Sequence, residues 1–120
     1  MRIINLTGHD VVIITQAGNI TIPKIAWFKL QLPLVVKQID VVLDNVSDWV
    51  IPLYDYEYTA PTELLEIFAP IKEGTIYVCS RVVAETSMRK DFYITGQHIK
   101  IDGKVIGTKG LQKNPYLRFQ

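Results

Sequence analysis

The sequence has little of what a cross-linked or metal-bound framework needs, with one cysteine, Cys79, and two histidines in 120 residues. A single thiol excludes an intramolecular disulfide and a multi-cysteine metal site. It also fits a reducing compartment, where thiols stay free. We therefore expect no metal and no cofactor, and a fold that is stabilised by its apolar core.

Long apolar runs and an excess of charge of one sign are also missing. The longest apolar runs are interrupted by Lys29, Lys37, Asp40 and Asp44, so no window reaches the ~18 consecutive apolar residues of a membrane helix. The amino terminus lacks the apolar stretch of a secretory signal. A net charge of +1 argues against nucleic acid as a partner. These absences predict a cytoplasmic protein that does not contact membranes.

The composition that remains is typical of one globular domain. Hydrophobic residues make up 48% of the chain and charged residues 21%, which is too apolar for a disordered segment. No internal repeat, low-complexity tract or linker divides the chain. We therefore expect a single domain over residues 1–120, long enough to bury about two-thirds of its unfolded surface.

Runs of β-branched residues and alternating patterns predict seven to eight short strands. Gly8 would place a bulge between the first two segments if these form one strand. The aspartate-glycine pair Asp102-Gly103 is typical of a tight hairpin turn. The segments with a strand pattern, of which the first two count as one if they are continuous, are 2–6, 11–15, 20–22, 35–43, 49–58, 75–79, 91–95, 98–101 and 104–106.

Two short helices are predicted, at about 61–69 and 81–88. Pro61 and Glu63 suit a first helical turn, and an apolar stripe follows until Pro70. Ser80 is a good N-cap for the second helix. The strands outnumber the helices, and both helices lie in the second half of the chain, which indicates an α+β fold. We expect a mostly antiparallel sheet or half-barrel with both helices packed on one face.

The first candidate site is the polar segment between two β runs that holds Asn5, Thr7 and His9. These side chains could hydrogen-bond the polar edge of a ligand, with His9 as an acid–base group, and Gly8 would let the backbone approach closely. The alternative is a bulge in which Asn5 and Thr7 satisfy backbone groups.

The second candidate site is Ser80-Arg81, at a junction between a predicted strand and a predicted helix. Free N–H groups at a helix start, joined by the guanidinium of Arg81, could bind a phosphate or carboxylate. The alternative is an ordinary cap followed by a solvated arginine. Cys79 lies inside the strand pattern, so we expect a buried thiol rather than a nucleophile.

Aromatic residues suggest two further surfaces. Tyr54, Tyr56 and Tyr58 alternate onto one strand face and could stack on bases. Core packing or cross-strand pairing is favoured, because Asp55 and Glu57 would repel phosphates. The basic carboxyl-terminal segment also carries Tyr116, and we expect it to dock on the domain or on a second subunit.

Three stretches resemble a family of small uncharacterised proteins of phages, prophages, bacteria and archaea. The opening Asn5-Leu6-Thr7-Gly8-His9 is similar to their asparagine-leucine-threonine-proline-histidine start, with glycine in place of proline. The stretch 77–84, followed by Arg89 and Asp91, and the glycine-rich stretch 103–111 are also similar. The resemblance implies a mobile-element context, with a host-cell cytoplasmic location, but no reaction. From the residues alone, Arg89 and Asp91 are expected to form an ion pair.

These observations favour a small intracellular binding module for a nucleotide-like or other anionic ligand. Asn5, Thr7 and His9 would line one wall, and Ser80 and Arg81 would contact the anion, so the two segments should converge. One alternative is a phage accessory structural or protein-interaction subunit, with homo-oligomers left open. Another is a nucleotide hydrolase or nuclease using His9 as base. No catalytic motif decides whether the protein is an enzyme.

Overall fold

The computed structural model describes residues 1–25, 29–42 and 50–119. Within them the chain forms ten strands, two α-helices and a short 3-10 helix, η1, so the α+β prediction is confirmed. In chain order the elements are β1 (Arg2–Asn5), β2 (Val11–Thr15), β3 (Gly18–Ile22), β4 (Leu34–Val42), β5 (Val50–Tyr58), α1 (Thr62–Phe68), β6 (Thr75–Val78), α2 (Arg81–Ser87), β7 (Phe92–Thr95), β8 (His98–Ile101), β9 (Lys104–Thr108), β10 (Leu111–Lys113) and η1 (Pro115–Phe119).

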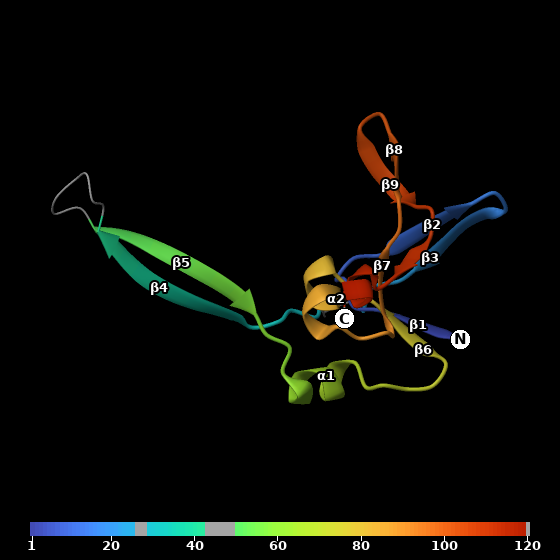
Figure 1. The fold of residues 1–120 in the computed structure, drawn as a ribbon. Helices are drawn as coiled ribbons and strands as arrows, with labels where there is room; N and C mark the ends of the chain where they lie inside the picture. Colours follow the sequence, from blue (N-terminus) through green and yellow to red (C-terminus); the bar gives the residue numbers. More distant parts are fainter. Residues whose placement is uncertain (26–28, 43–49, 120) are drawn as a thin grey trace.

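The strands form three sheets (Figure 1). The first has the order β1-β6-β7-β10, in which β6 pairs with β1 and β7 in parallel and β10 runs antiparallel to β7. The second has the order β3-β2-β9-β8 and joins two hairpins through a parallel contact between β2 and β9. The third contains β4 and β5 alone.

Of the expected mostly antiparallel sheet or half-barrel, the half-barrel is not confirmed, although most strand pairs of the described residues are antiparallel. The sheets do not close, and the centre of the first sheet is parallel because α2 carries the chain from β6 to the start of β7. A helical crossover allows parallel pairing, whereas a tight turn forces antiparallel pairing. Residue alternation does not reveal strand direction, so the sequence pattern could not distinguish the two arrangements.

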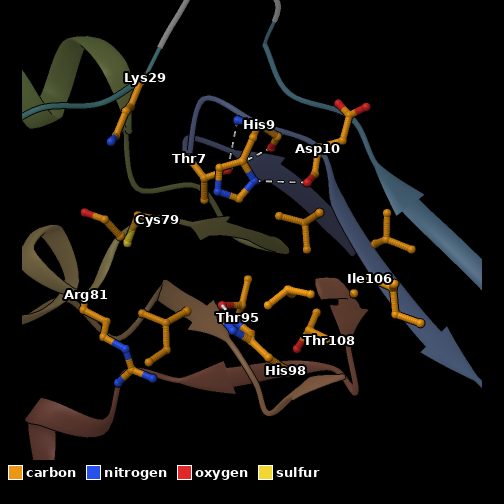
Figure 2. A pocket seen from close by; sticks show the side chains of 16 residues that line it. Thr7, His9, Asp10, Lys29, Cys79, Arg81, Thr95, His98, Ile106 and Thr108 are labelled. Carbon is orange, nitrogen blue, oxygen red and sulfur yellow. Dashed lines mark hydrogen bonds between the residues drawn. The ribbon is translucent and has the colours of Figure 1, made fainter. Parts of the chain in front are cut away.

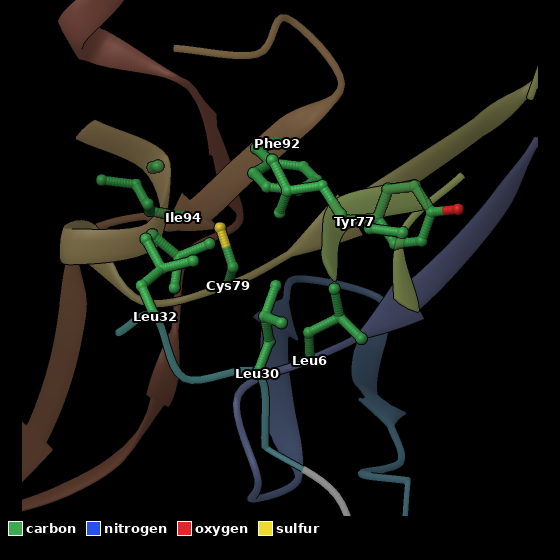
Figure 3. Packing of buried hydrophobic residues seen from close by; sticks show 11 residues of the cluster. Leu6, Leu30, Leu32, Tyr77, Cys79, Phe92 and Ile94 are labelled. Atoms are coloured by element: carbon green, nitrogen blue, oxygen red, sulfur yellow. The ribbon is translucent and has the colours of Figure 1, made fainter. Parts of the chain in front are cut away.

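The first sheet lies between two apolar layers. On one face, side chains of β6, β7 and both helices form a continuous cluster, and on the other face Val78 packs against Val11 and Ile22 of the second sheet. Both helices therefore contribute to one cluster, which Figure 3 shows in part. Its buried members include Leu6, Leu30, Leu65, Tyr77, Cys79, Val83, Ala84, Phe92 and Ile94.

The carboxyl-terminal segment docks on the domain, which is one of the two alternatives expected from the sequence. Tyr116 packs against the main cluster. Asn114 is buried, and its side-chain amide donates to the carbonyls of Ala84 at 2.8 Å and Arg89 at 3.1 Å. These bonds tie the carboxyl-terminal segment to the end of α2, where the Ala84 carbonyl also accepts from the Met88 N–H and the Arg89 carbonyl from the Phe92 N–H.

The hairpin β4–β5 forms an arm that projects from the body (Figure 1). The radius of gyration is 19.0 Å, whereas a compact domain of this length would have about 14 Å. Tyr54, Tyr56 and Tyr58 are 52%, 60% and 43% exposed. Core packing, one of the two expected arrangements, is therefore wrong, because the arm extends beyond the body that would have covered these tyrosines. Cross-strand pairing, the other arrangement, is confirmed, since Tyr58 lies opposite Leu34 and Tyr56 opposite Val36.

Candidate functional site

The two candidate segments meet at one edge of the first sheet. β1 and β6 are neighbouring parallel strands in which Asn5 pairs with Val78, so the loops that follow them leave at the same edge. The backbone N–H of Leu6 donates to the Val78 carbonyl at 2.8 Å and extends this pairing into the loop. Carboxyl ends of parallel strands are common positions for ligand sites. The structure thus brings together segments about 70 positions apart in the chain.

A pocket of about 570 Å³ opens where these loops meet (Figure 2). Thr7, Ser80 and Thr95 reach it from the carboxyl ends of β1, β6 and β7, and the second sheet forms the opposite wall. It is lined by Thr7, His9, Asp10, Val11, Val12, Lys29, Cys79, Ser80, Arg81, Ile94, Thr95, His98, Val105, Ile106, Gly107 and Thr108.

Asn5 does not line the pocket, contrary to the sequence-based expectation, but holds the loop that does. The side chain is 2% exposed, and its Nδ2 donates to the carbonyls of His9 at 2.8 Å and Ile22 at 3.0 Å. Its Oδ1 accepts from the Thr7 N–H at 2.9 Å and the Thr7 hydroxyl at 2.6 Å. Asn5 is therefore a positioning residue that uses both ends of its amide.

Gly8 gives the loop a conformation that few other residues would adopt. Its φ is +85°, and an added Cβ would lie 2.9 Å from the Cβ of Lys29. Proline, whose φ is fixed near −65°, could not take this conformation. The glycine therefore lets the loop lie against Lys29, which brings that ammonium group to the pocket wall.

Ser80 caps α2 and still faces the pocket. Its Oγ accepts from the Val83 N–H at 3.3 Å, as the N-cap prediction required, while the hydroxyl proton stays available as a donor. Arg81 is exposed, and no carboxylate of the described residues lies within ion-pair distance of it. α2 is only seven residues long. The positive charge at this wall of the pocket is therefore assigned to the Arg81 side chain and not to the start of the helix.

Two histidines reach the pocket, His9 from the loop after β1 and His98 from the start of β8. Nδ1 of His9 lies 3.1 Å from the Asp10 carbonyl. A carbonyl only accepts, so this contact places a proton on Nδ1 and leaves Nε2 for other partners. Nε2 of His98 lies 3.3 Å from the Thr95 hydroxyl. Sequence reasoning missed His98 and Lys29, because nothing local to either residue indicates which loops the sheets bring together.

Cys79 lines the pocket without being a nucleophile. The residue is 3% exposed, and burial raises the pKa of its thiol to about 12, with the nearby Asp91 carboxylate adding to the shift. The thiol therefore stays protonated at neutral pH. Its Sγ donates to the Tyr93 carbonyl at 3.6 Å. The expectation of a buried, unreactive cysteine is confirmed as to burial, and the raised pKa agrees with low reactivity.

The charges at the pocket favour an anion. Lys29 and Arg81 are cationic, whereas Asp10 is the one carboxylate among the described lining residues. That carboxylate accepts from the backbone N–H of Lys24 at 2.9 Å, so it is engaged in fixing the loop. The two histidines can add further positive charge when protonated.

Comparison with protein-family models, with curated proteins and with solved structures finds no significant match to this chain. Within the described ranges, His, Cys, Asp and Glu side chains form no group of three that could hold a metal ion. In that same part of the chain, none of the helices combines the length and the apolar composition needed to cross a membrane. The functional argument therefore depends on the pocket.

Proposed function

We propose that the pocket binds a small anionic ligand of nucleotide-like shape. The observation that carries this proposal is the convergence of the Thr7–Asp10 loop and the Cys79–Arg81 junction on one pocket. Both segments bring polar side chains to a space with two cations and one engaged carboxylate.

The polar end of the pocket suits a phosphate or carboxylate group. Arg81 can present a fork of N–H donors, and Lys29 a point charge, to an anion between them. The Ser80 hydroxyl adds a neutral donor to the lining. Charge-assisted hydrogen bonds of this kind contribute about 1.5–3 kcal/mol each.

The other wall of the pocket suits a flat, weakly polar body such as a base or sugar. Val11 and Val12 of β2 and Val105 and Ile106 of β9 line this wall from neighbouring strands of the second sheet. Gly107 allows the two strands to approach, because an added Cβ would lie 2.8 Å from the Val12 carbonyl oxygen. A volume of about 570 Å³ falls within the ~300–1,000 Å³ typical of small-molecule sites.

Phosphodiester hydrolysis is a second candidate, and the presence of His98 in the same pocket favours it. One histidine could act as general base and the other as general acid, with Arg81 stabilising charge on the transferred group. The contact of His9 Nδ1 with the Asp10 carbonyl leaves Nε2 as the acceptor of the neutral ring, which supports the role of base. The resemblance of the Asn5–His9 stretch to phage proteins supports a mobile-element setting for either function.

Isothermal titration with AMP, 3′,5′-cyclic AMP and inorganic phosphate tests the proposal. We expect at least one probe to bind, and Arg81→Gln to weaken that binding by about ten-fold or more, because a charge-assisted bond is lost. Lys109→Gln is the matched control, since Lys109 is exposed and does not line the pocket. It should change the affinity by less than about two-fold, as expected for a distant surface charge.

The outcomes separate the two candidates. Recovery of unchanged nucleotide by chromatography after titration supports binding alone, whereas conversion that is lost in His9→Ala supports hydrolysis. The absence of binding by all three probes at millimolar concentration, or equal effects of the Arg81 and Lys109 substitutions, would overturn the assignment of an anionic ligand to this pocket.

A further inference from the structure

A second pocket lies between α1 and the end of α2. Its volume is about 500 Å³, which falls within the ~300–1,000 Å³ typical of small-molecule sites. α1 contributes Leu65 and Glu66 to the lining, and α2 contributes Thr86 and Ser87. No described residue lines both this pocket and the first one, so the second pocket is a separate site.

Hydrogen bonds from the core hold the side of the second pocket that follows α1. Nη1 of Arg89 donates to the Ala69 carbonyl at 2.7 Å, and the Tyr77 hydroxyl donates to the Pro70 carbonyl at 2.5 Å. Ala69 and Pro70 both line the pocket. Because these bonds fix that wall without a ligand, little ordering of the wall opposes binding.

Arg89 offers unused hydrogen-bond donors at this pocket. A guanidinium group has five N–H groups. Two of them donate to the Asp91 carboxylate and one to the Ala69 carbonyl, which leaves one N–H on Nη1 and one on Nη2 without a partner among the described residues. The Arg89 side chain is 15% exposed and lines the pocket. A ligand oxygen there could therefore accept from Arg89 without displacing a native hydrogen bond.

The charges around the second pocket favour a cation. The guanidinium charge of Arg89 is balanced by the Asp91 carboxylate. Glu66 is exposed, and no cationic group of the described residues lies within ion-pair distance of its carboxylate. The other lining residues are uncharged, so one carboxylate remains unbalanced.

We propose that the second pocket binds the amino terminus of a peptide. In this complex the ammonium group donates to the Glu66 carboxylate, and the first carbonyl oxygen accepts from the free N–H groups of Arg89. An apolar first side chain packs against Ile71, which lines the pocket and is 79% exposed, and so removes apolar surface from water. A carboxylate in place of the carbonyl would be repelled by Asp91, which disfavours a free amino acid.

Titration with L-leucyl-L-alanine amide, followed in ¹H–¹⁵N spectra, tests this site. We expect the amides of Glu66, Ala69 and Ser87 to shift along one saturable curve below about 50 mM, as is typical of a small ligand with few contacts. The acetylated peptide keeps the carbonyl but lacks the ammonium group. It should bind about five-fold more weakly, because it loses a partly exposed ion pair.

Two substitutions in α1 separate the ion pair from general effects. Glu66→Gln should weaken binding of the free-amine peptide by about five-fold and of the acetylated peptide by less than about two-fold. Glu63→Gln is the matched control, because Glu63 is exposed on the same helix and does not line the pocket. It should change either affinity by less than about two-fold.

Unfolding temperatures close to that of the wild type would show that both variants are folded, as expected for exposed positions. The absence of a saturable shift in the three amides at about 50 mM peptide would overturn the proposal. Equal affinities for the free-amine and acetylated peptides, or equal effects of the two substitutions, would also overturn it, because Glu66 would then not contact an ammonium group.

Discussion

Asn5→Ala is expected to lower the free energy of unfolding by about 3 kcal/mol, because it leaves buried polar groups without partners. The Ile22 carbonyl loses a 3.0 Å bond, and the Thr7 N–H and hydroxyl lose their shared acceptor. Thr7 is itself 7% exposed, so water cannot readily replace the missing oxygen. The substitution should therefore unfold the loop that forms one wall of the pocket.

Urea unfolding followed by circular dichroism measures this effect. Asn19→Ala is the matched control, because Asn19 is exposed on β3, and it should stay within about 0.5 kcal/mol of wild type. If Asn5→Ala cost no more than the control, the hydrogen-bond network around the Thr7 loop would not determine its conformation.

Arg89→Ala is expected to cost about 3–4 kcal/mol, since it removes a largely buried charge that has several partners. Nε donates to Asp91 at 2.9 Å, Nη1 donates to the Ala69 carbonyl at 2.7 Å, and the guanidinium carbon lies 4.4 Å from the Phe92 ring centroid. The Arg89 and Asp91 side chains are 15% and 19% exposed. The substitution leaves the Asp91 carboxylate without its partner at the edge of the core.

The same unfolding measurement distinguishes the ion pair from general effects. Lys90→Ala alters the exposed neighbour and should be close to neutral. The double substitution Arg89→Ala with Asp91→Ala should recover part of the loss, because no unpaired carboxylate remains. Additive effects of the two single substitutions would show that Arg89 stabilises the protein through the Phe92 ring and the Ala69 carbonyl alone.

Local features of the fold were predictable from the sequence. The Ser80 cap fixes where α2 begins, and Asp102 and Gly103 take the positive φ values that their tight turn requires. The ion pair of Arg89 with Asp91 follows from their spacing at the start of β7 and is confirmed. Each of these depends on residues a few positions apart, which short-range sterics and hydrogen bonding determine.

Long-range pairing was not predictable in the same way. The parallel contacts of β6 with β1 and β7 depend on which β-rich segments meet, and each segment has a similar pattern. The convergence of Thr7 and Arg81 was therefore a hypothesis until the strand order was known. His98 lies in β8 and reaches the pocket through the pairing of β8 and β2 with β9 in the second sheet. Its own strand pattern gave no reason to expect it in a site.

The exposed arm shows a further limit of sequence patterns. Alternation predicts that Tyr54, Tyr56 and Tyr58 share a face, and the register confirms it. Alternation does not state what covers that face, because core packing and contact with another molecule favour the same residues. The length of β4 and β5, at nine residues each, carries the arm beyond the body.

The central claim, that an anionic ligand binds where the two loops meet, is tested most directly by amide chemical shifts. In ¹H–¹⁵N spectra recorded during titration with AMP, the amides of Thr7, His9, Ser80, Arg81 and His98 should shift together along one saturable curve. Shifts confined to the arm or the carboxyl-terminal segment, or no shifts at all in these five amides, would contradict the account.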